Sequence, residues 1–239
     1  MTTCIIIPMY NEEAVAAESL STILPYVRDL EDTILLVVDD GSSDATPEIL
    51  DRFVREEGVA RLEVVTHAEN KGYGAALFTG VQFARSRQID YVLFMDSDLT
   101  NHPRYLEKFY TKMEEGAEYI KATRYRKGGG MEGVPLKGQV FSRVGNMIGQ
   151  ALFRTPLSDV TNGFRAVRTS LYDGIVLREN GFAIIMEELY RLKPRITSYA
   201  EVPYILTSRA AGQGKSHFSY NLKTMLIYLS YAVRSCFTR

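Results

Sequence analysis

The sequence predicts an α/β fold in which a mostly parallel sheet is flanked by helices within a single domain. Short apolar runs alternate with longer amphipathic stretches through the first 125 residues, a pattern typical of parallel strands joined by crossover helices. Polar residues follow three of these runs, at the strand ends where such sheets bind ligands. A chain of 239 residues can bury a sizeable core and still form one domain.

The first half is predicted to alternate between strands and helices. Each predicted strand is an apolar run, and each predicted helix has apolar residues at helical spacing. The strands are 4–8, 33–39, 61–66, 91–95 and 119–123, and the helices are 12–27, 45–57, 74–87 and 103–115. Ser42, Ser43 and Asp44 can cap the second helix, and Pro103 suits the first turn of the fourth.

The pattern changes after residue 125. Helices are predicted at 139–153 and 182–192, with the turn-rich segment 158–165 between them and a further strand at 198–205. The glycines at 128–130 form too short a run to separate two domains. The second half is therefore predicted to continue the same domain.

The composition excludes several classes of protein. A net charge of −1 and a pI near 6.3 argue against a nucleic-acid-binding protein, because such proteins draw affinity from a basic excess. Cys4 and Cys236 lack the spacing of a zinc site or a disulfide framework, which favours a reducing compartment. The chain begins directly with an apolar strand and without the regions of a signal peptide, so a cytoplasmic location is expected.

The last part of the chain combines basic and apolar character. The glycine-containing loop 208–216 is basic, and stretch 222–233 has apolar residues around nearly its whole helical circumference. This stretch is shorter than the roughly 20 apolar residues that span a bilayer. It fits two placements. With Lys223 and Arg234 at its flanks it suits a membrane surface, and as a short apolar helix it suits packing on the core or on a partner subunit.

Asp96 and Asp98 are the most informative residues, because they follow the apolar run 91–95 two positions apart. Alternation along a strand would place both carboxylates on one side. Hard oxygen ligands of this kind suit Mg²⁺ or Mn²⁺, which usually keep positions open for substrate phosphates. Two solvated acids in a turn would show the same spacing, so the rest of the sequence has to decide between the two interpretations.

Two further strand ends carry polar residues. Asp39 and Asp40 follow the second apolar run, and the first run ends at Pro8 and leads into Tyr10 and Glu12. Because the carboxyl ends of parallel strands meet at one edge of a sheet, these side chains are predicted to share a crevice with the first acidic pair.

The segment 70–76 contains two glycines but no dinucleotide fingerprint, because its spacing differs from Gly-x-Gly-x-x-Gly and it follows the third strand. A nicotinamide-dependent enzyme is therefore not expected. The glycines would allow either close packing of a helix against its neighbours or a ligand at the helix N-terminus, and the sequence leaves both open.

Five segments together resemble glycosyltransferase family 2, and most closely its dolichol-phosphate mannose synthase and polyprenyl-phosphate glycosyltransferase branch. They occur in the family's order and cover nearly the whole chain. The segments are 7–13, 37–42, 70–72, 96–98 and 159–165. The resemblance implies a GT-A fold, which is Rossmann-like, and inverting, metal-dependent transfer of a hexose from GDP-mannose or a UDP-sugar to a polyprenyl or dolichyl phosphate.

The resemblance also implies roles for particular residues. Asp96 and Asp98 match the metal site, for Mg²⁺ or Mn²⁺. The matches to the nucleotide-sugar site are Pro8, Tyr10, Glu12, Asp39, Asp40, Lys71, Asp96, Ser97 and Glu187. The matches to catalytic positions are Asp98, Arg124, Asp159, Arg209 and Lys215.

The chemistry of the implied reaction agrees with these assignments, because the departing nucleoside diphosphate carries charge that a metal and arginines would neutralise. Arg209 and Lys215 share a glycine-bearing loop that could close over the site, although each basic residue alone also fits ordinary surface charge. Glu187 also fits a solvated helix face.

Asp159 fits three roles. It matches a candidate base of the related enzymes. A lipid monophosphate acceptor would already be largely anionic at pH 7, since its second pKa is about 6, and Asp159 would then orient the acceptor or a sugar hydroxyl. It could also cap the turn at Asn162 and Gly163.

Two departures from the branch affect these expectations. Thr100 stands where a glutamine is frequent, which leaves fewer protein ligands for a metal. Gly138 stands where a basic residue is frequent, so Lys137 or Arg143 would have to replace it in phosphate binding.

We therefore divide the chain into a GT-A catalytic domain, 1–218, and a C-terminal apolar helix, 219–239. Within the domain, 1–125 form the nucleotide-sugar half and 126–218 the acceptor half. The expected location is the cytosolic face of a membrane, as a peripheral protein with a possible membrane-protein partner. Two alternatives stay open: a family 2 transferase for a soluble or protein-linked glycan, and a non-catalytic subunit that binds a nucleotide-sugar.

Overall fold

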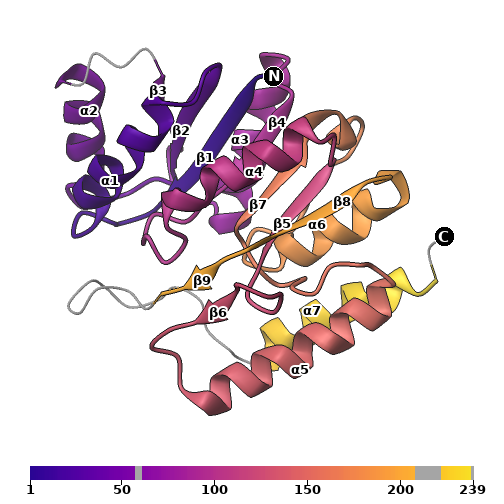
Figure 1. Ribbon diagram of the computed structural model, residues 1–239. Coiled ribbons are helices and arrows are strands. Elements are labelled where there is room, and N and C mark those ends of the chain that lie inside the picture. The colour runs from indigo at the N-terminus through magenta and orange to yellow at the C-terminus, as the bar shows by residue number, and fades with distance from the viewer. Residues whose placement is uncertain (57–60, 208–221, 238–239) are drawn as a thin grey trace.

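The computed structural model describes residues 1–56, 61–207 and 222–237. Its centre is a sheet whose described strands run in the order β3-β2-β1-β4-β7-β5-β8 (Figure 1). The strands are β1 (Thr3–Met9), β2 (Thr33–Asp39), β3 (Leu62–Thr66), β4 (Tyr91–Phe94), β5 (Tyr119–Thr123), β7 (Arg165–Arg168) and β8 (Tyr199–Pro203). Helices cover both faces, which confirms the predicted α/β class.

One strand of the sheet was not predicted. β7 lies between β4 and β5 and is antiparallel to both, whereas the other neighbouring strands of the sheet run parallel. Its Arg165 and Arg168 interrupt the apolar run by which the other strands are recognised. The sheet is therefore mostly parallel, with one reversed strand in its interior.

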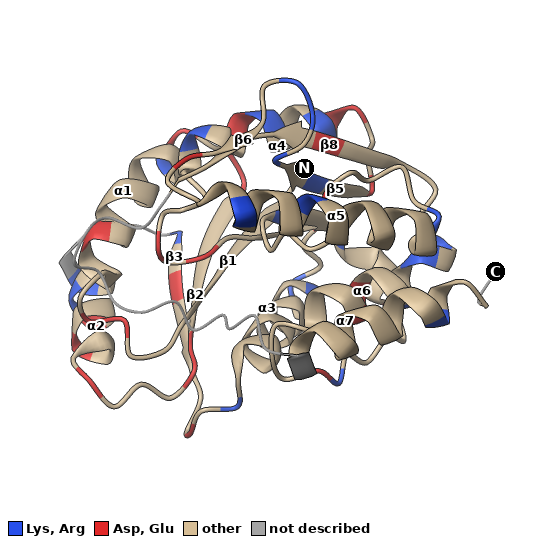
Figure 2. Cartoon of the chain, turned by 90° about the horizontal axis from the view of Figure 1, so that it is seen from below, with Lys and Arg blue, Asp and Glu red and all other residues tan. Residues whose placement is uncertain are grey.

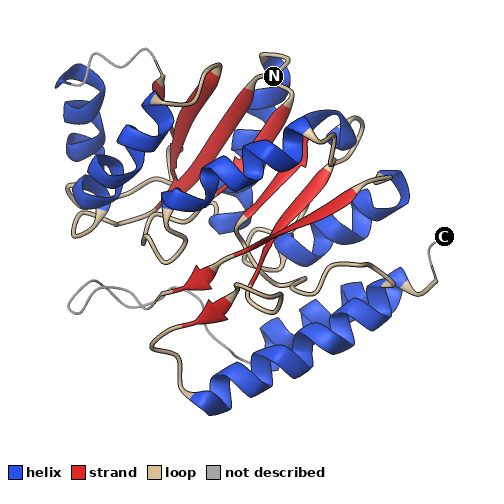
Figure 3. Ribbon diagram, in the orientation of Figure 1, coloured by secondary structure: helices blue, strands red, loops and turns tan. Residues whose placement is uncertain are grey.

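Helices pack on the two faces in separate groups (Figure 3). α1 (Ala16–Arg28), α2 (Thr46–Glu56) and α4 (Leu106–Glu114) cover one face, and α3 (Tyr73–Ser86) and α6 (Ile184–Leu192) cover the other. α5 (Leu136–Phe153) and α7 (Leu222–Ser235) lie beyond the sheet, where α7 packs on both α5 and α6. β1 supplies both cores, since Ile5 and Ile7 face the first group while Cys4 and Ile6 face the second. A central parallel strand buried on both faces explains this continuous apolar run.

Several element boundaries differ from the predicted ones for local reasons. The first helix begins at Ala16, four residues late, because Asn11 adopts a left-handed backbone (φ 52°) within a turn that precedes it. The predicted strand 198–205 divides at Tyr204 into β8 and the short β9 (Ile205–Leu206). β9 pairs with β6 (Gly130–Met131) in a second, two-stranded sheet. Short 3₁₀ turns complete the described chain: η1 (Pro103–Tyr105), η2 (Thr169–Tyr172) and η3 (Lys193–Arg195).

None of the helices in the described part of the chain has the length and apolar character needed to cross a bilayer. Cys4 and Cys236 are both free thiols.

Candidate functional site

A cavity of about 400 Å³ opens beyond the carboxyl ends of β1, β2 and β4. It lies where ligands bind in open α/β sheets. Its walls include seven of the residues predicted for the donor and metal sites, which are Pro8, Tyr10, Glu12, Asp40, Asp96, Ser97 and Asp98. The three polar strand ends therefore share one crevice, as the sequence predicted.

Hydrogen bonds hold the loop after β1 against the loop after β2. The amide of Asn11 donates to Ser42 Oγ (2.9 Å), and the amide of Ser43 donates back to Asn11 Oδ1 (2.8 Å). The amide of Glu12 donates to Thr46 Oγ1 (2.9 Å). These contacts keep the rim of the cavity in place.

Asp39 lies at the end of β2 and is fully buried. Its Oδ1 accepts a hydrogen bond from the amide of Ser42 (3.1 Å), whereas its buried Oδ2 has no hydrogen-bond partner among the described residues. A buried carboxylate oxygen without a partner costs free energy. A ligand N–H or O–H that reached this oxygen would remove that cost.

Asp40 has a structural part in the site. Its Oδ1 accepts from the amide of Lys71 (2.9 Å) and lies 2.6 Å from His67 Nδ1, and its Oδ2 accepts from the amide of Gly72 (2.7 Å). The carboxylate thus fixes the backbone that leads into α3. The side chain of Lys71 is exposed and does not line the cavity.

The glycines before α3 serve close packing. A Cβ at Gly72 would lie 2.4 Å from the carbonyl oxygen of Asn180, and one at Gly74 would lie 2.1 Å from that of Glu179. The amide of Gly74 also donates to the Asn180 carbonyl (2.7 Å). Gly72 lines the cavity as well, so both interpretations left open by the sequence apply to it.

The acidic pair lies in a turn, because β4 ends at Phe94. The prediction that strand alternation places both carboxylates on one side is therefore wrong, because neither residue belongs to the strand. Both carboxylates nevertheless line one cavity. Thr100 holds Asp98, since its amide (3.1 Å) and its hydroxyl (2.7 Å) both donate to Asp98 Oδ1. The residue that departs from the branch pattern thus orients one of the acids.

Asp96 is fixed from two sides. The hydroxyl of Tyr73 donates to its Oδ1 (3.1 Å), and Asn101 Nδ2 donates to its Oδ2 (3.1 Å). The ring of Tyr73 stacks on Phe182, with centroids 4.4 Å apart. Burial, followed by the negative charge of Asp96, raises the pKa of Tyr73 well above its ordinary value, so its hydroxyl stays a donor.

Asp96 and Asp98 have the donor chemistry of a magnesium or manganese site. The described residues hold no cluster of three or more His, Cys, Asp or Glu side chains that could bind a metal. Mg²⁺ is commonly bound by one or two carboxylates together with water and substrate phosphates. Two carboxylates facing a shared cavity fit that mode, in which a phosphate ligand completes the coordination.

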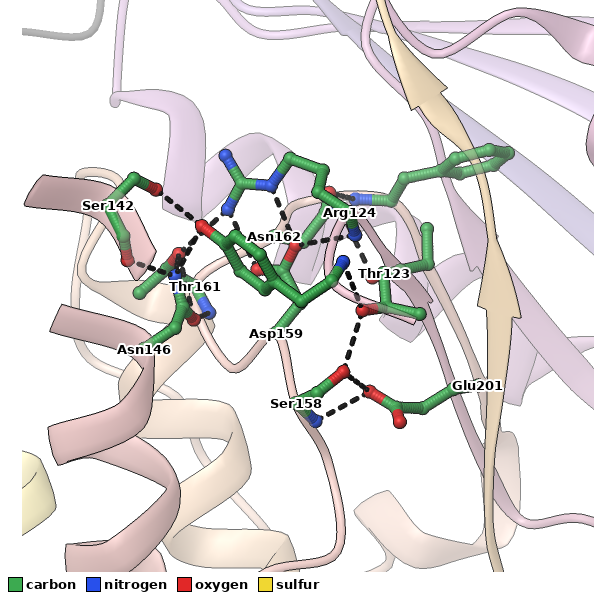
Figure 4. Close-up of polar contacts among 12 residues, drawn as sticks. Thr123, Arg124, Ser142, Asn146, Ser158, Asp159, Thr161, Asn162 and Glu201 are labelled. Carbon is green, nitrogen blue, oxygen red and sulfur yellow. Dashed lines mark hydrogen bonds and ion pairs between the residues drawn. The ribbon is translucent and has the colours of Figure 1, made fainter. Parts of the chain in front are cut away.

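Arg124 and Asp159 form a buried ion pair (Figure 4). Arg124 Nε and Nη2 donate to the two carboxylate oxygens at 2.7 and 2.8 Å, and the side chains are 10% and 0% exposed. Burial opposes the charge of Arg124, but the adjacent carboxylate outweighs it and raises the arginine pKa. The arginine is therefore a fixed cation, and both carboxylate oxygens of Asp159 are engaged in hydrogen bonds to it.

The ion pair lies beside the cavity and not in its wall. A Cβ at Gly163, in the same turn as Asp159, would lie 3.5 Å from Asp96 Oδ2. Burial raises the pKa of Tyr204, the charge of Arg124 opposes this, and the charges of both Asp159 and Asp96 add to it. The predicted catalytic pair and the predicted metal ligands are therefore neighbours.

The remaining predicted residues lie further from the cavity or outside the described chain. Glu187 is buried and accepts hydrogen bonds from the amides of Arg178 and Glu179 (2.7 and 2.8 Å). It thereby holds the loop that carries Phe182, and direct contact with a sugar stays a prediction. Arg209 and Lys215 lie outside the described residues.

The two candidates for the missing basic residue are placed differently. The guanidinium of Arg143 lies 6.0 Å from the ring centroid of Tyr125, and that of Arg124 lies 5.3 Å from the same ring. Lys137 is exposed near the start of α5. Arg143 is therefore the one that reaches the neighbourhood of the buried ion pair.

Four residues of the cavity wall were not predicted from the sequence. Tyr73, Asn180, Gly181 and Phe182 line the cavity but were not predicted as site residues. Tyr73 directly follows the Asn-Lys-Gly segment, and an aromatic residue at that helix start was the available signal. The loop with Phe182 had none, because contacts with residues distant in the sequence, such as Gly72 and Gly74, bring it to the cavity.

Comparisons with known proteins identify similar sequences. The profile described as "Glycosyl transferase family 2" matches residues 4–176. The chain is 30% identical over 226 residues to a dolichol-phosphate mannosyltransferase of Pyrococcus furiosus, covering 92% of this chain and 62% of that one. It is 28% identical over 236 residues to a polyprenol monophosphomannose synthase of Mycolicibacterium smegmatis, covering 97% and 87%. The chain thus spans less than two thirds of the Pyrococcus protein.

Solved structures share the fold. Glucosyl-3-phosphoglycerate synthase from Mycobacterium tuberculosis, in complex with Mn²⁺, UDP-glucose and phosphoglyceric acid, matches all of this chain and 80% of its own, with a TM-score of 0.67 and 22% identity. The same protein with Mg²⁺ and UDP matches with a TM-score of 0.69 and 22% identity, over 100% of this chain and 80% of that one. These matches confirm the predicted GT-A arrangement.

Proposed function

This chain belongs to glycosyl transferase family 2, and from that membership we propose that it moves a hexose from a nucleotide-sugar to a polyprenyl phosphate. Mannose from GDP-mannose is the first donor to test, because the two named relatives are mannosyltransferases. The observation that carries the proposal is that Asp96 and Asp98 share one cavity with Tyr10 and Glu12.

The cavity supplies the groups that a nucleotide-sugar needs. Asp39 is buried next to Asp40 of the cavity wall, and its unpartnered Oδ2 would accept a hydrogen bond from a base or ribose that reached it. Tyr10 offers an aromatic surface in the cavity wall. The diphosphate would lie near Asp96 and Asp98. When bound there, Mg²⁺ or Mn²⁺ would neutralise charge on the departing nucleoside diphosphate.

Arg124 and Asp159 fit a lipid phosphate acceptor better than a sugar hydroxyl. A sugar hydroxyl must lose its proton to a base, whereas a phosphate oxygen is already largely anionic at pH 7. Asp159 accepts hydrogen bonds from two guanidinium nitrogens of Arg124, Nε and Nη2, and is fully buried. We therefore propose that Asp159 positions Arg124, whose charge attracts the acceptor phosphate.

A peripheral location at a membrane follows from this acceptor, because a polyprenyl chain resides in lipid. Asp40, Glu187 and Thr100 act indirectly in this proposal. They hold, in turn, the start of α3, the loop with Phe182 and the carboxylate of Asp98.

The test is a transfer assay. The purified protein is incubated with labelled GDP-mannose, UDP-glucose or UDP-N-acetylglucosamine, with Mg²⁺ or Mn²⁺ and a polyprenyl phosphate, and label entering the organic phase is counted. We expect transfer from one donor that stops with chelator and falls at least about a hundredfold in Asp98→Asn, through loss of charge stabilisation.

The matched control is Asp51→Asn, because Asp51 is an exposed acid on α2 whose ion pair with Arg55 is solvated. It should transfer at the wild-type rate. Undiminished transfer by Asp98→Asn would exclude the metal role. Metal-dependent donor binding without lipid transfer would instead favour a soluble acceptor or a missing partner subunit.

A further inference from the structure

Lys121 is a buried lysine of β5, the strand that leads into Arg124. Most lysines and arginines lie on helices and loops, whereas this one lies on a strand of the central sheet (Figure 2). It is fully buried, and its Nζ has no hydrogen-bond partner among the described residues. Because an ammonium group without a partner is costly to bury, burial favours the uncharged amine.

Two ion pairs near Lys121 are complete without it. Arg165 lies opposite Lys121 in β7, and its Nε and Nη2 donate to the two carboxylate oxygens of Glu188, both at 2.7 Å. Arg124 holds the two oxygens of Asp159 in the same way. While Lys121 is uncharged, each positive charge of these two pairs is therefore matched by a negative one.

The strand on the other side of β5 repeats this arrangement. Glu201 lies opposite Lys121 in β8, and its Oε2 accepts a hydrogen bond from Arg126 Nε (2.6 Å). Its Oε1 accepts from the amide and the hydroxyl of Ser158 (2.6 and 2.7 Å), the residue directly before Asp159 (Figure 4). Each of the three carboxylates that the structure describes around Lys121 thus has an arginine partner.

The tyrosines around Lys121 stay uncharged near pH 7. The hydroxyls of Tyr119 and Tyr172 both donate to Glu188 (3.0 and 2.7 Å), and burial, followed by the charge of this glutamate, raises the pKa of each tyrosine well above its ordinary value. Burial also raises the pKa of Tyr199 in β8 to about 12. It lowers that of Lys121 to about 7, so this pKa makes the lysine the member of the cluster that can gain a charge near neutral pH.

A phosphate at Arg124 would upset this balance of charge. A phosphate monoester carries close to two negative charges above pH 7, and nearby negative charge favours a protonated lysine. We propose that Lys121 is the reserve cation of the acceptor site: when an anionic phosphate monoester binds at Arg124, Lys121 takes up a proton from solvent, and its new charge helps to hold the phosphate. This inference deepens the proposed function and rests on its phosphate acceptor.

The same coupling would favour release of the product. Sugar transfer turns the phosphate monoester into a diester, which carries one negative charge. With less negative charge at Arg124, Lys121 loses its proton to solvent again, and the product is held more weakly than the acceptor. Lys121 acts on both ligands through its charge and without touching them, so it is a positioning residue.

Isothermal titration calorimetry tests the proposal. The full chain is titrated at pH 8 with a short, water-soluble isoprenyl phosphate, in buffers of different ionisation enthalpy, which reports the protons taken up on binding. At this pH the ester is already a dianion. We expect the wild type to take up about one proton and Lys121→Met to take up none. Methionine suits a buried position, so the variant should keep its fold, which thermal unfolding checks.

The pH dependence of ester affinity is a second readout. Between pH 7 and pH 9 the wild-type affinity should fall by up to about tenfold per pH unit, because binding requires a proton that becomes scarcer. Lys121→Met and Lys121→Arg should both lack this fall, since methionine has no proton to gain and arginine none to lose. A merely structural role for Lys121 would lower the affinity without changing its dependence on pH.

The matched control is Lys108→Met, because Lys108 is an exposed lysine of α4. It should take up protons and bind the ester as the wild type does. Equal proton uptake by Lys121→Met and the wild type would overturn the proposal. Ester binding by the wild type without proton uptake would overturn it as well.

The failure of the reserve cation and the failure of the proposed function can be separated, because the calorimetry needs no sugar donor. Sugar transfer to the ester without proton uptake that depends on Lys121 would retain the function and reject the reserve cation. Proton uptake that depends on Lys121, without transfer from any donor, would do the reverse. A wild type that does not bind the ester would reject both.

Discussion

Lys121 is a buried cation for which the fold provides no hydrogen-bond acceptor among the described residues. Its neighbours are already matched in charge, because Arg165 pairs with Glu188 and Arg124 pairs with Asp159. Burial, reinforced by the charge of Arg165, lowers the pKa of Lys121 from 10.5 to about 7. If Lys121 were protonated, this cluster would hold three positive charges but only two carboxylates, those of Glu188 and Asp159.

Lys121→Met is expected to stabilise the protein by roughly 1–3 kcal/mol at pH 7, since it removes an unsatisfied buried donor. The unfolded chain binds the lysine proton up to about pH 10.5, whereas the folded chain releases it near pH 7, so wild-type stability rises with pH across that window. The gain should shrink between pH 7 and pH 10. Urea unfolding at several pH values measures it, and a gain independent of pH would contradict this account.

Asp159→Asn tests whether the aspartate acts as a base or as a support. Removing one partner of a buried ion pair leaves Arg124 uncompensated, so we expect a loss of roughly 3–5 kcal/mol in unfolding free energy. Residual transfer should keep the wild-type pH profile, because no proton is lost to Asp159. A pH profile that loses its acidic limb in the variant would identify a base instead.

At the scale of elements, the start of α3 and the loop with Phe182 depend on each other. Gly74→Ala would bring a Cβ to 2.1 Å from the Glu179 carbonyl and push this wall of the cavity outward. Since small displacements in a site reduce rates strongly, we expect kcat/KM for the donor to fall roughly tenfold to a hundredfold. Steady-state kinetics measures this.

The control for this prediction is Gly145→Ala, because Gly145 also lies in a helix but a Cβ there meets no atom within 4 Å. Alanine favours the interior of a helix, where Gly145 lies, by about 1 kcal/mol over glycine. The control should therefore be as active as the wild type and slightly more stable. Equal kinetics for the two variants would show that the contact with the loop is dispensable.

The sequence predicted elements well where one property dominated. β1 and β2 are apolar throughout because they are buried on both faces, and their patterns needed no further context. β7 was missed because it contains arginines whose burial depends on partners distant in the sequence. Arg165, for example, donates a hydrogen bond to Glu188. In the candidate site, too, roles that depend on partners distant in the sequence could not be predicted. The carboxyl-end residues follow apolar runs and were predicted, whereas the structural part of Asp40 depends on His67 and Gly72, which only folding brings near.

At the scale of the whole molecule, nucleotide binding should couple to stability. A ligand that binds only the folded state at 100 times its Kd adds about 2.7 kcal/mol. We expect the nucleoside diphosphate of the preferred donor to raise Tm with Mg²⁺ or Mn²⁺ and to lose most of this effect with chelator, as the Asp96 and Asp98 site requires. A chelator-insensitive shift would show binding without the metal.

The position of the reversed strand β7 also constrains the order in which the strands of the sheet can assemble. β4 and β5 are made within the first 123 residues, yet the space between them stays one strand wide until Arg165–Arg168 has been synthesised. The growing chain can complete β1, β2, β3 and β4 early, but β5 has no neighbouring strand of this sheet to join before β7 is made, and β8 follows later still. Closure of the central sheet is thus a late, non-local step, of the kind that slows folding and exposes strand edges to other chains.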